Sequence, residues 1–266
     1  MQIPAYEKNT FLAALPAAEF AVLRSHLAPF DLRIGHCLYY RGDQVGHVVF
    51  PLSGLVAMTM PARENGGAGV ILIGRDGLVG AFAAEASAPA ACDAEVHIGG
   101  PALRISAPAF RHVLEQSPSI RRHAARFDSA MMAQAQQTAL CHAAHSVEAR
   151  ICRWLLEVEA RSDSSKVPLT QSTLAQMLGV RRTTVTLVAG RLEAAGVIKC
   201  HRGYIQIISH EQLERCSCEC YAQVRAYVAK LTAAPDEGVT PRSLSEPGTP
   251  SAARQPSRII PSIGLN

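Results

Sequence analysis

Three cysteines stand at alternate positions near the C-terminal end of the chain, at Cys216, Cys218 and Cys220. Thiolates bind soft metal ions and also form redox pairs, so this spacing allows either chemistry, with His210 and Glu219 as further ligand types nearby. On a helix, however, alternate residues point in divergent directions and cannot all contact one ion. Free, partly buried thiols are the alternative, so the three cysteines are only weak metal candidates.

A second group of ligand types is formed by Cys141, His142 and His145. Helix capping and hydrogen bonds between helices account for such residues more often than metal binding, so we expect a structural role. The sequence shows no Ser-His-Asp set, no paired carboxylates at a defined spacing and no glycine-rich phosphate loop. We therefore expect a protein that is not an enzyme.

The stretch TQSTLAQMLGVRRTTVTLVAGRLE at 170–193 has the spacing of two helices joined by a tight turn. The small residue Ala175 is followed four positions later by Gly179 and six further on by the β-branched Val185. Gly179 can adopt a positive φ at little cost, which ends the first helix. This pattern is typical of a helix-turn-helix, with helices expected at 171–178 and 182–195.

After the second helix, two short strand-like runs flank the tight turn His201-Arg202-Gly203. They predict a β-hairpin at 198–208, with Arg202 at its tip. A helix-turn-helix followed by a hairpin is a winged helix. A purely structural helix pair without a role in DNA binding is the alternative interpretation.

The charge distribution favours the DNA-binding interpretation. The chain has 26 Lys and Arg against 22 Asp and Glu, a net charge of +4. Residues 1–140 and 231–266 are each neutral, whereas 168–203 contain five basic residues and a single acid, Glu193. Positive charge concentrated on the second helix and the hairpin predicts a double-stranded DNA partner.

The elements that precede this segment predict an α+β fold. Strands separated by turn residues are expected between about 32 and 105, which suggests a sandwich or barrel. The candidate strands are Val45–Phe50, Leu55–Met60, Val70–Ile73, Glu95–Ile98 and Ala102–Ile105. Pro51, Ser53 and Gly54 interrupt the uncharged stretch 44–62, so it is expected to form strands rather than a membrane span.

A long helix is expected at about 119–144, because this stretch contains neither Gly nor Pro. Residues spaced alternately by four and three form a weak heptad seam, which suggests a dimerisation helix; packing on the chain's own sheet is the alternative. The seam consists of Ile120, Ala124, Phe127, Met131, Gln134, Thr138 and Cys141.

Four segments follow from these patterns: a strand-rich domain at 1–117, the dimerisation helix at 118–144, a winged-helix domain at 145–230 and a tail at 231–266 rich in Pro, Ser and Gly, which is expected to be disordered. The eight cysteines are too scattered for a disulfide scaffold, and no signal peptide is evident. We therefore expect a cytoplasmic protein.

Over about residues 10–230 the chain resembles the Crp/Fnr superfamily of bacterial transcription regulators. The resemblance rests on the pattern Arg41-Gly42-Asp43 with the Phe50–Gly54 turn, on the long helix, and on the run from Leu169 to Ile198. It implies an N-terminal β-roll like that of cyclic-nucleotide-binding domains, a dimerisation helix and a C-terminal winged helix-turn-helix. It also implies a homodimer, a palindromic operator and contact with RNA polymerase.

The resemblance further implies roles for individual residues. Those expected to face base edges are Arg182, Thr183, Thr186 and Leu187. Those expected to hold phosphates are Thr170, Gln171, Arg181, Thr184 and Arg202. Position 183 is Thr where well-known members carry Glu, so their half-site sequence does not transfer.

In this family the N-terminal β-roll is the sensor domain, which corresponds to residues 1–117 here. This part of the chain departs from the relatives that bind cyclic nucleotides or iron–sulfur clusters. Residues 77–103, where a cyclic phosphate would be held, contain no Lys or Arg, and a buried phosphate without a cation is costly. Only Cys37 lies in the first 90 residues, which also disfavours an N-terminal iron–sulfur cluster. We expect a transcription regulator without a cofactor; a metal or thiol-redox sensor that uses the C-terminal cysteines is the alternative.

Overall fold

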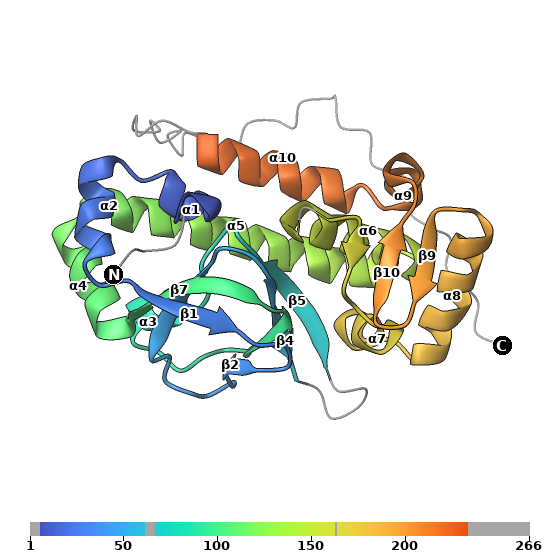
Figure 1. Ribbon diagram of the computed structural model, residues 1–266, viewed down its shortest axis with the longest axis horizontal. Helices are drawn as coiled ribbons and strands as arrows, with labels where there is room; N and C mark the ends of the chain where they lie inside the picture. Colours follow the sequence, from blue (N-terminus) through green and yellow to red (C-terminus); the bar gives the residue numbers. More distant parts are fainter. Residues whose placement is uncertain (1–5, 62–66, 163, 234–266) are drawn as a thin grey trace, which may run out of the picture. The chain divides into compact units, whose positions relative to one another are not determined.

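Two antiparallel sheets form the N-terminal domain of the computed structural model, which describes residues 6–61, 67–162 and 164–233 (Figure 1). The first sheet has the strand order β1-β7-β3 and the second the order β2-β6-β4-β5. The strands are β1 (Ala28–Leu32), β2 (Cys37–Tyr39), β3 (His47–Pro51), β4 (Leu55–Met60), β5 (Ala68–Ile73), β6 (Asp93–Ile98) and β7 (Gly100–Ser106). All five expected strands are therefore present, with ends within two residues of those expected.

Strands β1 and β2 and the short helices α1 (Thr10–Ala13) and α3 (Ala81–Ala86) were not expected in this domain. Strand β1 contains Pro29 and Asp31, residue types that are uncommon in strands, β2 has only three residues, and the helix α3 is short. The turn after β3 needs Gly54, which has φ +85°, and a Cβ there would lie 2.6 Å from the Ile98 carbonyl oxygen. Strands β3 and β4 consequently enter different sheets instead of pairing with each other.

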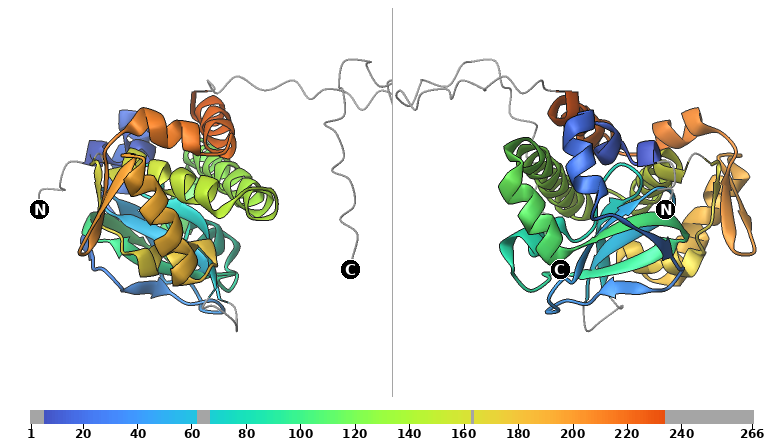
Figure 2. Two further views of the ribbon diagram at one scale, coloured as in Figure 1. Left: turned by 90° about the vertical axis from the view of Figure 1, so that its right-hand side faces the viewer. Right: turned by 60° about the vertical axis from the view of Figure 1, so that its left-hand side comes forward.

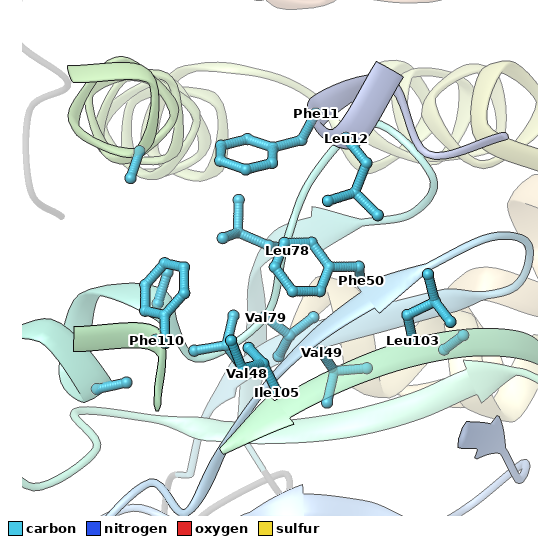
Figure 3. Close-up of a cluster of buried hydrophobic side chains, with 14 of the residues drawn as sticks. Phe11, Leu12, Val48, Val49, Phe50, Leu78, Val79, Leu103, Ile105 and Phe110 are labelled. Carbon is cyan, nitrogen blue, oxygen red and sulfur yellow. The ribbon is translucent and has the colours of Figure 1, made fainter. Parts of the chain in front are cut away.

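A core of apolar side chains holds the first sheet to the helices around it (Figure 3). Phe50 on β3 and Ile105 on β7 are buried, as is Phe110 on α4 (Ala107–Gln116). The short helices α1 (Thr10–Ala13) and α2 (Ala17–Arg24) add Phe11 and Leu23 to this core. Burial of such large side chains is the main stabilising contribution of the domain.

The long helix α5 (Pro118–Ala144) begins where its sequence predicts. The Ser117 hydroxyl caps it by accepting a hydrogen bond from the Ile120 amide at 3.0 Å, and Pro118 occupies the first turn. The expected dimer seam, however, faces the interior of its own chain. Of that seam, Ile120, Ala124, Gln134, Thr138 and Cys141 are buried, and Phe127 and Met131 are half-buried against the N-terminal core.

The seam is polar at two positions because these positions hydrogen-bond within the chain. The Gln134 Oε1 atom accepts from the Leu72 amide on β5 at 3.3 Å, and the Thr138 hydroxyl accepts from Arg153 at 3.0 Å. The interpretation of this seam as the face that meets a partner is thus wrong for this conformation, and the alternative, packing on its own sheet, holds.

The C-terminal domain combines helices with a small sheet. Its helices are α6 (Val147–Ser162), α7 (Gln171–Leu178), α8 (Arg182–Ala194), α9 (His210–Cys216) and α10 (Cys220–Ala233). Its sheet has the order β8-β10-β9, formed by β8 (Lys166–Val167), β9 (Ile198–His201) and β10 (Tyr204–Ile207). The Ser146 hydroxyl caps α6 by accepting a hydrogen bond from the Ala149 amide at 3.3 Å.

A second apolar core joins this domain to the sheet that contains β4 and β5. Trp154 on α6 packs so closely on β5 that a Cβ at Gly69 would lie 2.9 Å from its ring. Helix α10 runs beside α5 (Figures 1 and 2) and extends three residues past the expected start of the tail. The rest of the expected disordered tail, 234–266, lies outside the described residues. Among the described helices, none is long and apolar enough to cross a bilayer.

Candidate nucleic-acid interface

The turn between α7 and α8 has the geometry that its residues predict. The Thr170 hydroxyl caps α7 by accepting from the Thr173 amide at 3.0 Å. Gly179 adopts φ +61°, and the Val180 amide donates to the Ala175 carbonyl at 3.0 Å, which closes the helix end. Ala175 is buried, so its small side chain lets α8 cross close to α7. The expected helix-turn-helix is confirmed.

Helix α8 has one buried and one exposed face. Val185, Val188, Ala189 and Leu192 are buried against α6 and α7. The four residues expected to read bases, Arg182, Thr183, Thr186 and Leu187, are all exposed. Leu187 is 59% exposed, which leaves it free to contact a ligand.

The residues expected to hold phosphates flank this face. Thr170, Arg181 and Arg202 are exposed, whereas Gln171 and Thr184 are half-buried. Gln171 also has a role that the sequence did not indicate, since its Oε1 atom accepts a hydrogen bond from the Thr186 hydroxyl at 2.8 Å. The assignments to bases and phosphates remain predictions.

The hairpin β9–β10 places Arg202 in its tight turn, where Gly203 has φ +90°. The rings of His201 and Tyr204 stack at 4.4 Å on either side of this turn. Strand β8 adds a third strand that was not expected, because two residues are too few to show a period.

Glu193, the single acidic residue in 168–203, is bound to the backbone of the wing. Its Oε1 atom accepts a hydrogen bond from the Cys200 amide at 2.7 Å. Arg181, Arg182 and Arg202 are exposed, as are Arg191 and Lys199. This surface, which we call the basic face, is therefore suited to a polyanion.

The structure joins the two candidate groups of metal-ligating residues into one. Donor atoms of Cys141, His145, Cys218 and Cys220 all lie within 4.8 Å of one another. Cys216 is not a member of this group, because it packs against the second apolar core.

Two other expected ligand types also lie outside the group. His142 is not a member of it, and His210 instead contacts Glu159, with 2.7 Å between Nδ1 and Oε2. Sequence spacing could not reveal the group, since its two halves are 77 residues apart.

A cavity of about 90 Å³ lies between the second sheet, α3 and α5. Part of its lining comes from 77–103, the segment in which the resemblance would place a cyclic phosphate. Phe82, Phe127, Met131 and Asp128 contribute to its lining, which includes no Lys or Arg. Burial, reinforced by the charge of Glu85, raises the pKa of Asp128 to about 6. The lining is thus apolar, with an acid as its charged group.

Comparison with known proteins agrees with these observations. Residues 149–216 match the family described as the Crp-like helix-turn-helix domain. No curated protein shows significant sequence similarity to the chain.

Solved structures of Crp/Fnr regulators share the fold. A putative regulator of this family from Eubacterium rectale is 17% identical with a TM-score of 0.62, and the match covers 79% of this chain and 98% of that one. FixK2 from Bradyrhizobium japonicum is 15% identical with a TM-score of 0.63, covering 72% and 98%. A CRP/FNR-family regulator from Thermus thermophilus is 21% identical with a TM-score of 0.61, covering 71% and 98%.

Proposed function

Because the chain has the Crp/Fnr fold and carries a Crp-like helix-turn-helix domain, we propose that it is a homodimeric transcription regulator that binds a palindromic DNA operator. Helix α8 of each subunit enters a major groove, and the wing contacts the phosphate backbone. The two recognition helices lie about 34 Å apart, one turn of DNA, so the operator has two-fold symmetry.

The observation that carries this proposal is the composition of the basic face. Arg182 can donate two parallel hydrogen bonds to guanine, and the exposed Leu187 can contact a thymine methyl group. Arg181 and Arg202 are also exposed and supply charge for phosphates.

The face of α5 that supports a homodimer is the one opposite to the expected seam. Exposed residues recur along it with alternating spacings of four and three, as in a coiled coil, and most are small enough for two helices to approach closely. This exposed seam consists of Ala125, Ser129, Met132, Gln136, Ala139 and Ala143. We propose that a second copy of the chain covers it. Met132, which is 60% exposed, is then buried in the dimer.

We further propose that cyclic nucleotides do not regulate this protein. The small cavity beside α5 has Asp128 and the ring of Phe127 in its wall and no cation among its lining residues. A cyclic phosphate placed there would lose its hydration without gaining a charged partner, which is costly. Isothermal titration with cyclic AMP is expected to show no binding at micromolar concentrations.

Selection of bound fragments from random DNA, followed by footprinting, tests the main proposal. We expect an imperfect palindrome protected on both half-sites. Arg182→Ala should weaken binding, whereas Arg24→Ala, which changes an exposed arginine on α2 far from the basic face, should not. A protected region without two-fold symmetry, or equal effects of the two substitutions, would contradict the proposal.

A further inference from the structure

Three thiols and one imidazole converge where the C-terminal end of α5 meets the start of α10. The Cys141 and Cys218 sulfur atoms are 3.5 Å apart, and the Cys220 sulfur is 3.4 Å from the Nδ1 atom of His145. The three cysteines are buried and His145 is half-buried. Nothing in the proposed DNA binding uses these groups, so their convergence requires another explanation.

The break between α9 and α10 makes this convergence possible. If 216–220 were one helix, Cys218 and Cys220 would point in divergent directions. Instead α9 ends at Cys216, the Ser217 backbone is extended at φ −79° and ψ 164°, and α10 begins at Cys220. Cys141 and His145 lie one helical turn apart at the end of α5, and α10 packs on α5, which brings the two pairs together.

All donor atoms of the group lie within 4.8 Å of one another, close to the separations in a tetrahedral metal site. Zinc bound by three thiolates and one imidazole, with bonds of about 2.3 Å to sulfur and about 2.0 Å to nitrogen, has ligand–ligand separations of roughly 3.5–3.8 Å. The two measured contacts, 3.5 Å and 3.4 Å, lie at or just below the lower end of this range. Small rotations of the side chains suffice to admit an ion.

The surroundings also fit bound thiolates. Glu219 lies 3.3 Å from the Nε2 atom of His145, the nitrogen that faces away from Cys220, and a carboxylate at this place orients a metal-bound imidazole. Gln137 donates a hydrogen bond to the Cys220 sulfur at 3.0 Å.

We propose that Cys141, His145, Cys218 and Cys220 form a Cys₃His site for a thiophilic divalent ion such as Zn²⁺. The site itself does not depend on the proposed function. The regulatory role of the site, in contrast, rests on the proposed function. His145 ends α5 and Ser146 caps α6, so an ion here ties α10 to the hinge between the dimerisation helix and the DNA-binding domain. Metal occupancy thereby regulates the orientation of the basic face.

Metal titration of the full-length protein tests the site without DNA. The protein is reduced, stripped with a chelator and dialysed against Zn²⁺, and bound metal is measured by elemental analysis; Co²⁺ serves as the spectroscopic probe. We expect one ion per chain, with the thiolate-to-cobalt charge-transfer bands and the intense visible bands of a tetrahedral complex. Cys218→Ser and His145→Gln are each expected to weaken Zn²⁺ binding by at least about tenfold.

Cys216→Ser is the matched control, because it removes a thiol two residues from Cys218 that lies outside the group. It should retain one ion and the tetrahedral spectrum. His145→Gln changes a half-buried side chain and keeps the test valid if Cys218→Ser fails to fold, as checked by circular dichroism.

Two results would overturn the site: no bound ion in the reduced protein, or an octahedral cobalt spectrum. Operator binding is then measured separately with and without Zn²⁺. Metal binding without any effect on DNA affinity would refute the regulatory consequence and leave the site intact, whereas failure to bind DNA at all would refute the proposed function.

Discussion

The Thr186 hydroxyl donates a hydrogen bond to the Gln171 side-chain oxygen at 2.8 Å, which links the recognition helix α8 to the first turn of α7. One residue of this pair is expected to read a base and the other to hold a phosphate. The bond therefore couples the two kinds of contact, since a shift of either side chain displaces the other.

Replacing Thr186 with Val removes this hydrogen bond and keeps the β-branched shape. Because the pair lies near the surface, we expect the free energy of unfolding to fall by less than about 1 kcal/mol. Operator affinity should fall more than stability does, and the double variant with Gln171→Ala should lose less affinity than the sum of the single variants. Additive losses in a double-mutant cycle of DNA binding would show that the pair is not coupled.

Substitution of Arg182 and substitution of Arg202 should weaken DNA binding in different ways. The loss of affinity should depend on the DNA sequence for Arg182 but not for Arg202. Arg182→Ala is expected to cost about 1–3 kcal/mol on the preferred operator and to relax specificity at one base pair. Arg202→Ala should weaken binding to all sequences about equally. Affinities for the operator and for single-base variants of it, measured at several salt concentrations, separate the two effects. For the unaltered dimer, log K should fall with log salt with a slope of about −4 to −5.

The two seams of α5 predict opposite effects on assembly and stability. Met132→Glu places a charge on the exposed seam, so it should dissociate the dimer while the fold of each subunit persists. Ile120→Ala opens a cavity in the buried seam and should destabilise the fold by about 2–5 kcal/mol, with the dimer still formed at low temperature. Analytical ultracentrifugation and thermal unfolding distinguish them. If the Ile120→Ala variant were monomeric and the Met132→Glu variant dimeric, the buried seam would be the dimer interface.

Asp128 makes stability depend on pH in a defined direction. Burial and Glu85 raise its pKa from 3.8 to about 6 in the folded protein, so the folded state binds more protons than the unfolded state between these values. The contribution of Asp128 to the free energy of unfolding therefore falls as pH rises from about 4 to about 6. Above pH 6 the destabilisation by the buried carboxylate is fully present. Asp128→Asn should raise the free energy of unfolding at pH 7 by an amount on the order of 1 kcal/mol.

Chemical denaturation at pH 4.5 and pH 7 checks this prediction. The gain from Asp128→Asn should be larger at pH 7. A gain that is equal at both values, or a loss at pH 7, would show that Asp128 is not held in this environment.

The sequence by itself determined the helix-turn-helix, because its signals are local. The spacing of Ala175, Gly179 and Val185 reflects contacts within one turn of chain, and the bounds of α7 and α8 follow the expected ones to within a residue. Turn residues likewise located five strands of the β-roll, β3 to β7. Strands β1, β2 and β8 were missed, because they are too short or too polar to show a period.

Only the tertiary structure decided which face of α5 is buried and which cysteines meet. Periodicity identified a seam on this helix but could not say whether the chain itself or a partner covers it. The packing of β5 and α6 against Gln134 and Thr138 settled that point. Likewise, no local pattern relates Cys141 to Cys218, because only the break before α10 and its packing on α5 bring them together. Contacts between residues distant in sequence depend on the whole fold, and they place the candidate metal site at the hinge.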